Sequence, residues 1–501
     1  MFSKERNYKH KLAVIGDSMA LGFKNGGIYR TDLSFPAILA ELIEENCCFD
    51  LPSFTAQAGI PINLEILVRG VAEEYGDDIN LFKSVSAARS VYKTLSRIKS
   101  YWEGHKKSLK VERDSPYHNQ SVWGFAISDS MMIDEAYCRE MIRNNKIRYS
   151  VFNVLPDHAM YTTARMVLNP TFSIETSDKA MVDNISELHS DGGIENLIIC
   201  IGHNNIVGAV TNLNIRLSEQ RDVMNYYASR NCTVFRPEHF EIEMRTLYKR
   251  IESLGVKRVF VPTIPHVTIP PAIRGVNENR TKPLNGYFDY YTRFWIWDDD
   301  FNPEKHPHLT KDEAIFLDSI VDDYNQIIRN LAAEFGYHVI PVGRYVSAAA
   351  RRRRGSYTAK PFPVKFVEAL KKNPQTEYLV DENGDPRIST DYLKLDRETG
   401  KIASGGIFSL DGLHPSTIGY GLIANIYKKH MAEQGVHFHR DIDWNYIINS
   451  ETLVTDPPPL LHNLRLLLRW MAMGNQEKMM FLGKNMLEQM LEVFSAAPKL
   501  D

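Results

Sequence analysis

The chain has 501 residues, of which 44% are hydrophobic and 24% are charged. These are the proportions of an ordinary globular protein, and the length is ample for a full hydrophobic core. The formal net charge is −3, so no overall positive field favours nucleic acid or an anionic membrane as a partner. No stretch reaches the roughly 18 uncharged apolar residues of a membrane span, so we expect no transmembrane segment.

The N-terminal residues and the cysteines bear on the cellular compartment. Residues 1–11 are polar and charged and lack the apolar core of a signal peptide, so we expect a cytoplasmic protein. The five cysteines are odd in number and lack the spacing of metal ligands. We therefore expect reduced thiols and no bound metal.

The first predicted strand is the apolar run at residues 12–15, which ends at Gly16 and is followed by Asp17 and Ser18. A short apolar run closed by glycine is typical of a buried parallel strand. Ser18 would then lie at the carboxyl edge of the sheet, where open α/β sheets hold their ligands. Gly-Asp-Ser is also an ordinary turn sequence, so this segment alone does not decide between a nucleophile and a turn.

Helices and four further strands alternate along the rest of the chain. Residues 35–46 form the first long predicted helix, with Ser34 as its N-cap. Later strands are predicted at residues 117–124, 196–202, 258–261 and 337–342, and later helices at residues 237–255, 311–336 and 417–435. This alternation implies a parallel sheet with helices on both faces. The predicted fold is α/β, with three α/β/α layers around a five-stranded parallel sheet and large helical insertions.

The remaining segments define the expected domain organisation. Residues 1–440 are predicted to form one domain with insertions at about 60–115 and 345–405, followed by a helical extension over residues 441–501. In the extension, Leu464, Leu467, Leu468 and Met471 fall on one helical face. That face suits packing against the domain, or a surface contact with another copy, a partner or a membrane.

Two surface features have open interpretations. The four arginines at residues 351–354 suit either recognition of a phosphate or carboxylate on a substrate, or a solvated loop. The aromatic and acidic segment at residues 287–297 suits either the lining of an acyl or sugar pocket, or the packing of a long loop.

Chemically useful groups follow three predicted strands or loops. Ser18 follows the first strand, His203 and Asn204 follow the third, and a loop before the last helix contains Asp411 and His414. The spacing of Asp411 and His414 lets the carboxylate accept the imidazole Nδ1 proton, which leaves Nε2 to take a proton from serine. For any one of the 16 histidines a structural role is the alternative, but here serine, asparagine and Asp-x-x-His are expected at one sheet edge.

These segments resemble the four sequence blocks of SGNH, or GDSL-type, hydrolases, in the order of that family. The first block matches residues 16–19 and the fourth matches residues 411–415. The second resembles residues 119–124 and the third resembles residues 202–205. The likeness to bacterial GDSL-type lipases and esterases covers most of residues 11–435 and implies a flavodoxin-like SGNH hydrolase fold.

The resemblance implies a role for each residue of a catalytic triad. Ser18 would be the nucleophile, His414 the general base and then the general acid, and Asp411 the group that orients the imidazole. The tetrahedral oxyanion would be bound by the backbone N–H groups of Ser18 and Gly124 and by the Asn204 side chain. This mechanism requires no metal and no organic cofactor.

Three further residues qualify this assignment. Gly59 is a weaker rival of Gly124 for the oxyanion role. His203 is a candidate substrate contact, with a structural role as the alternative. Asn205 stands where the family has an aspartate, a change that leaves the mechanism intact and alters how the loop is anchored.

The expected activity is hydrolysis of a small-molecule or lipid carboxylic ester through an acyl-enzyme. Acyl transfer to an alcohol would use the same site. A catalytically silent binding or scaffold protein is the non-enzymatic alternative, and it would be expected to have lost the serine, asparagine or histidine. The sequence does not choose between fatty-acyl esters, acetylated sugars and lysophospholipids.

Overall fold

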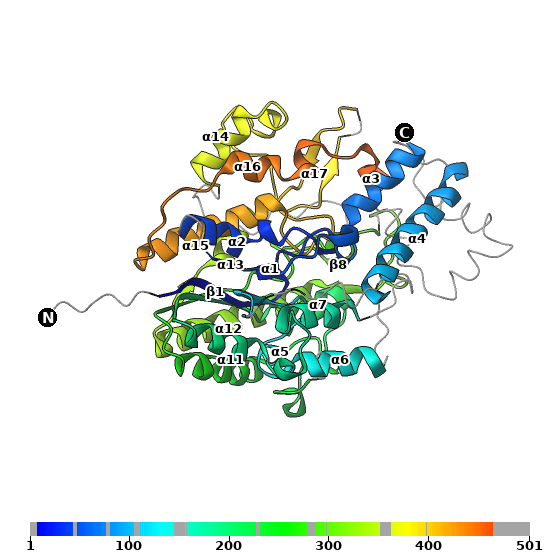
Figure 1. The fold of residues 1–501 in the computed structure, drawn as a ribbon. Helices are drawn as coiled ribbons and strands as arrows, with labels where there is room; N and C mark the ends of the chain where they lie inside the picture. Colours follow the sequence, from blue (N-terminus) through cyan, green and yellow to red (C-terminus); the bar gives the residue numbers. More distant parts are fainter. Residues whose placement is uncertain are drawn as a thin grey trace.

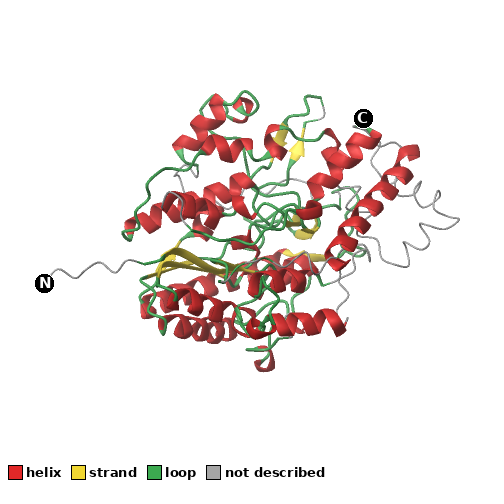
Figure 2. Ribbon diagram, in the orientation of Figure 1, coloured by secondary structure: helices red, strands yellow, loops and turns green. Residues whose placement is uncertain are grey.

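A parallel sheet lies at the centre of the computed structural model, enclosed by helices (Figures 1 and 2). Its five strands are β1 (His10–Gly16), β4 (Asn119–Ser121), β5 (Ile194–Cys200), β6 (Arg258–Pro262) and β10 (His338–Ile340). The spatial order is β10-β6-β5-β1-β4, with every pair parallel. Counted along the chain this is 2-1-3-4-5, one of the two common orders of doubly wound sheets. All five strands coincide with segments predicted from the sequence.

The structure describes residues 8–43, 48–76, 81–104, 111, 113, 115–144, 156, 158–226, 231–278, 286–296, 298–350, 362–396 and 398–463. The predicted features at Arg351 to Arg354, at Trp297 and in the helices after residue 463 (with Leu464, Leu467, Leu468 and Met471) lie outside these residues.

Successive residues of a strand point to opposite faces of the sheet. Both faces therefore have apolar side chains, and helices cover them. Ala13 and Ile15 of β1 belong to the core formed with α11 (Pro237–Glu252) and α12 (Lys311–Phe335). Leu12 and Val14 belong to the core formed with α2 (Phe35–Ile43) and α15 (Thr417–Glu433). Figure 1 shows α11 and α12 below β1, and α2, α13 and α15 above it. Because β1 is buried on both faces, its sequence is a continuous apolar run.

Local capping explains where the long helices begin and end. Thr310 and Glu313 form a capping box at the start of α12, and Gly336 ends that helix in the left-handed conformation. Ser416 Oγ accepts the N–H of Gly419 and so caps α15. Ser34 precedes α2 as predicted, but its buried hydroxyl has no hydrogen-bond partner in the described part of the chain.

The predicted insertions contain short elements that surround the sheet edge. The first contains β3 (Ile60–Pro61), α3 (Leu64–Tyr75) and α4 (Leu81–Gly104), and β3 pairs with β2 (Gly27–Ile28). The second follows β10 and contains α13 (Val342–Ala349), α14 (Val364–Lys372), β11 (Lys394–Leu395) and β12 (Ile402–Ser404). The short helix α1 (Ser18–Leu21) precedes the first insertion. Between the two insertions lie α5 (Asp129–Met132), α6 (Glu135–Asn144), α7 (Ala159–Leu168), α8 (Met181–Ser190) and α9 (Val207–Asn212).

The aromatic segment forms part of a second, antiparallel sheet. This sheet consists of β7 (Ile273–Val276), β8 (Tyr290–Arg293) and β9 (His308–Thr310), and it was not predicted from the sequence. Tyr291 is fully buried, and the ring of Phe294 stacks on that of Tyr392 at 4.8 Å. The side chains of Tyr291 and Phe294 therefore pack this segment against the protein.

Residues 441–463 share the core of the main domain. They contain α16 (Trp444–Asn449) and α17 (Thr452–Thr455). Trp444, Ile447 and Leu453 are buried in the same apolar cluster as α2 and α15. The described part of the expected extension is thus packed against the domain.

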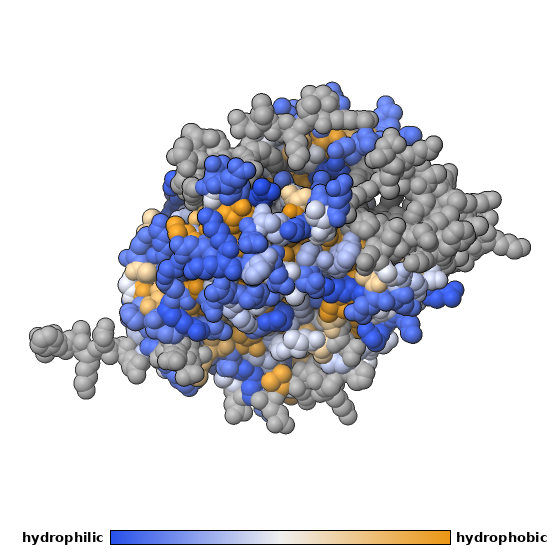
Figure 3. Space-filling view, turned by 90° about the horizontal axis from the view of Figure 1, so that it is seen from above, coloured by the Kyte–Doolittle hydropathy of each residue, from blue (hydrophilic) through white to orange (hydrophobic). Residues whose placement is uncertain are grey.

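In the view of Figure 3, mainly hydrophilic residues cover the molecule, with small apolar areas between them. None of the described helices is both long and apolar enough to cross a membrane. Cys48, Cys138 and Cys200 are free thiols.

Candidate active site

Ser18 is the first residue of α1, directly after β1. Asp17 is the N-cap of this helix, and its Oδ1 accepts the N–H of Met19 at 3.0 Å. At Gly16 the chain passes so close to its neighbours that a Cβ would lie 2.6 Å from Ser121 Oγ. The serine therefore lies at the carboxyl edge of the sheet, beside the point where the strand order reverses, which is the usual ligand position of such folds.

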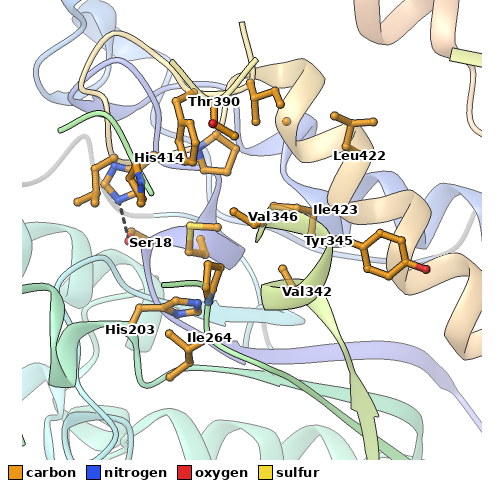
Figure 4. Close-up of a pocket in the computed structure, with 18 of the residues that line it drawn as sticks. Ser18, His203, Ile264, Val342, Tyr345, Val346, Thr390, His414, Leu422 and Ile423 are labelled. Carbon is orange, nitrogen blue, oxygen red and sulfur yellow. Dashed lines mark hydrogen bonds between the residues drawn. The ribbon is translucent and has the colours of Figure 1, made fainter. Parts of the chain in front are cut away.

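Ser18, His414 and Asp411 are arranged in series, with His414 between the other two, as a catalytic triad requires. His414 Nε2 lies 2.9 Å from Ser18 Oγ (Figure 4). On the other side of the ring, His414 Nδ1 lies 3.2 Å from Asp411 Oδ2. Ser18 and His414 are both buried but line a cavity. In this arrangement the imidazole can take the serine proton while the carboxylate holds the ring.

Asp411 is anchored by backbone donors on two sides. Its Oδ1 accepts the N–H groups of Leu413 and His414, both at 2.8 Å, and its Oδ2 accepts the N–H of Gly26 at 3.0 Å. Burial alone would raise the pKa of Asp411, but the His414 ring and these N–H donors outweigh it and hold the pKa below its ordinary value. The group is therefore a fixed negative charge next to the imidazole.

The predicted oxyanion donors lie around the same cavity. Asn204 is in the turn after β5, and its Nδ2 donates to the carbonyl of Phe125 at 2.9 Å. This bond orients the amide and leaves the second Nδ2 hydrogen available to an oxyanion. Gly124 has φ +81°, a left-handed conformation that favours glycine. Ser18, Gly124 and Asn204 all line the cavity.

Gly59, the rival of Gly124, has a different environment. Its carbonyl accepts the indole N–H of Trp102 at 2.7 Å, and a Cβ at this position would lie 2.2 Å from the carbonyl oxygen of Ile28. Gly59 is not among the residues that line the cavity. The geometry thus favours Gly124.

His203 and Asp17 form a second imidazole–carboxylate pair beside Ser18. His203 Nδ1 lies 2.8 Å from Asp17 Oδ2, and the Asp17 side chain is fully buried. A carboxylate only accepts, so the ring donates from Nδ1. His203 lines the cavity, and in Figure 4 Ser18 lies between the rings of His203 and His414. This pairing was not predicted, because the two residues are 186 positions apart.

Asn205, which stands where SGNH hydrolases have an aspartate, faces a buried glutamate. Asn205 Oδ1 accepts the N–H of Ile127 at 3.2 Å, and its Nδ2 lies 3.3 Å from Glu243 Oε2. Burial raises the pKa of Glu243 to about 7. An aspartate at position 205 would place two buried carboxyl groups in contact, so the amide suits this partner. Glu243 was not found by sequence reasoning.

The cavity at the triad has a volume of about 540 Å³. Its polar lining consists of the catalytic candidates Ser18, Asn204 and His414, of His203, and of more dispersed side chains, namely Thr211, Tyr345, Thr390, Asn425 and Lys429. The rest is mostly apolar, from Phe23, Ile264, Val346, Phe408, Leu422 and Ile423 among others (Figure 4). Such a pocket is typical of a site for a largely apolar small molecule.

Comparisons with known proteins add no identification. The chain matches no model of a known protein family and no curated protein. Within the described ranges, no group of three or more His, Cys, Asp or Glu side chains is arranged to hold a metal ion.

Proposed function

We propose that the protein is a serine ester hydrolase with an SGNH-type fold. The observation that supports this most directly is the contact of Ser18, His414 and Asp411, which come from segments almost 400 residues apart. The four family-like segments and the 2-1-3-4-5 strand order support it further. The proposal rests on this geometry and on the sequence resemblance.

The proposed reaction begins with attack of Ser18 Oγ on the ester carbonyl. His414 Nε2 takes the serine proton as the Oγ–carbon bond forms, and Asp411 stabilises the resulting imidazolium. When the tetrahedral intermediate collapses, the carbon–oxygen bond to the alcohol breaks and His414 protonates the departing alcohol. Water then attacks the acyl-enzyme with His414 as base, which releases the carboxylic acid and restores Ser18.

The negative charge that develops on the carbonyl oxygen needs donors placed in advance. The candidates are the N–H groups of Ser18 and Gly124 and the second amide hydrogen of Asn204. Ser18 is the first residue of α1, where helix N–H groups have no partner within the helix. Each such donor is typically worth about 3 to 4 kcal/mol in the transition state.

A scaffold function is the weaker alternative, because it does not require Ser18 and His414 to be in hydrogen-bond contact. The proposal is tested by p-nitrophenyl ester hydrolysis and by labelling with a fluorophosphonate, using wild type, Ser18→Ala and His414→Ala. We expect hydrolysis that both substitutions abolish, and labelling that requires Ser18. Undiminished hydrolysis by Ser18→Ala, or a wild type that neither hydrolyses esters nor reacts with the probe, would contradict it.

A further inference from the structure

The cavity continues from the triad into a space between α13 and α15. On α13 the residues that line it are Val342, Tyr345, Val346 and Ala349, and on α15 they are Gly419, Leu422, Ile423, Asn425, Ile426 and Lys429. The α13 set has the spacing i, i+3, i+4 and i+7 of one helix face, and so do Gly419, Leu422, Ile423 and Ile426 on α15. Figure 4 shows Val346 and Ile423 projecting into the space between the two helices.

Apolar faces of neighbouring helices normally interlock, because protein interiors are close-packed. Here the two faces are instead separated by part of a cavity of about 540 Å³. Leaving such an apolar space unfilled costs stability, since its lining loses packing contacts. A space of this kind that opens onto a catalytic serine is best explained by a ligand that fills it.

The length of the lining limits what that ligand is. Gly419 is five residues after His414, and Lys429 is ten residues further along α15. At 1.5 Å per residue, the lined part of the helix is about 15 Å long. A fully extended chain advances about 1.2 Å per bond, so the cavity matches a linear chain of about twelve carbons.

The lining also indicates the polarity of the ligand. The catalytic groups cluster at the Ser18 end, whereas the α15 lining is apolar at Leu422, Ile423 and Ile426. Asn425 adds one uncharged polar side chain there, and Lys429 is the first charged residue of α15 that lines the cavity. A ligand with one ester group and a long apolar chain fits this one-sided distribution. An acetylated sugar would place hydroxyl groups against apolar side chains without hydrogen-bond partners.

We propose that the space between α13 and α15 binds the linear acyl chain of the ester substrate, with an optimum near twelve carbons. This inference deepens the proposed hydrolase function and rests on it. It assigns Leu422 and Ile426 as residues that set chain length, with Ile426 one helical turn further from Ser18. It excludes short acyl groups such as acetate as the preferred substrates.

The first test measures kcat/KM for p-nitrophenyl esters of two to sixteen carbons. In wild type we expect a rise of about fourfold per methylene that ends near twelve carbons. Leu422→Trp should shorten this limit and lower the dodecanoate-to-butyrate ratio by at least about a hundredfold. Ile426→Trp should place the limit about five carbons beyond that of Leu422→Trp, because four residues of helix span about 6 Å.

Ala432→Trp is the matched control, because it places the same side chain on an exposed position of α15, and it should keep the wild-type profile. A flat wild-type series, or equal limits for Leu422→Trp, Ile426→Trp and Ala432→Trp, would overturn the proposal. So would a chain-length preference seen only with acetate esters of long alcohols, since the chain would then lie in the alcohol half. Thermal melting shows whether each variant is folded.

A second measurement separates this proposal from the hydrolase function. Dodecanoate binding to Ser18→Ala, followed by calorimetry, should be saturable and weakened at least tenfold by adding Leu422→Trp. Binding without wild-type hydrolysis would support the chain site and contradict the hydrolase. Labelling of Ser18 by a short fluorophosphonate, with no dodecanoate binding and no chain-length preference, would support the hydrolase and overturn the chain site.

Discussion

Gly26 donates its backbone N–H to the same oxygen of Asp411 that faces His414 Nδ1, at 3.0 Å and 3.2 Å respectively. The loop after α1 thus holds the carboxylate that contacts His414, the proposed general base. Asn25 in the same loop reinforces the link, because its N–H donates to Ser409 Oγ and its Oδ1 accepts the N–H of Leu410. The segment that follows Ser18 therefore also fixes the position of Asp411.

Asp411→Asn should lower kcat by about 10³- to 10⁴-fold. Two donors face each carboxylate oxygen, and an amide has only one acceptor oxygen, so either orientation turns its NH₂ toward N–H groups. Esterase kinetics test this, with the melting temperature to show that the variant is folded. A loss smaller than about tenfold would show that His414 does not depend on Asp411.

Asn204→Ala should lower kcat by about 10²- to 10³-fold and leave KM within a few-fold of wild type. An oxyanion donor acts on charge that develops only in the transition state, so its loss does not weaken substrate binding. Michaelis–Menten kinetics with one p-nitrophenyl ester separate the two constants. A rise in KM at unchanged kcat would assign Asn204 to substrate binding instead.

His203→Ala should lower kcat/KM by about tenfold, the effect of losing one hydrogen bond to a substrate oxygen. Asp17→Asn should give a similar change, because Asp17 holds the ring while an asparagine still caps α1. Kinetics of both variants and of the double variant provide the measurement. Wild-type kinetics in folded His203→Ala would assign this residue a purely structural role.

Folding stability should decline below about pH 6.5 because of a buried histidine pair. His10 Nδ1 lies 2.8 Å from His118 Nε2, and His118 Nδ1 accepts the N–H of Asp50 at 3.0 Å. Burial first, and the neighbouring His10 second, lower the pKa of His118 to about 4. The unfolded chain therefore binds a proton before the folded chain does, and the stabilisation present above pH 6.5 is lost progressively down to about pH 4.

For His118 this loss amounts to about 3 kcal/mol. Urea unfolding at pH 7.5, 6.0 and 5.0 measures the decline, and His118→Asn should flatten it because the variant lacks the titrating group. Parallel declines in wild type and His118→Asn would mean that other groups cause the acid sensitivity.

The central sheet could be predicted because the sequence patterns that specify it involve residues close together in the chain. The continuous apolar run of β1 reflects its burial on both faces. The Gly-Asp-Ser segment comes directly after a strand, and the Asp-x-x-His segment comes shortly before a helix. These patterns involve neighbours in the chain, which a single sequence displays. The same reasoning located the helices predicted at residues 311–336 and 417–435.

Contacts between distant segments were not predictable in this way. Nothing near Gly26 indicates that its N–H meets Asp411, 385 positions later. Lys24 Nζ donates to Thr417 Oγ1 at 2.7 Å and lies 3.7 Å from Glu451 Oε2, in a segment expected to lie outside the domain. The β7-β8-β9 sheet was missed because its aromatic and acidic composition has no clear alternation.

The separation of Ser18 and His414 by 396 positions has a consequence for biosynthesis. At a synthesis rate of 5 to 20 residues per second, the serine leaves the ribosome roughly 20 to 80 s before its general base. The nascent chain therefore carries an unactivated hydroxyl for most of its production. Any hydrolytic activity begins only after the segment that contains His414 has folded onto the part made first.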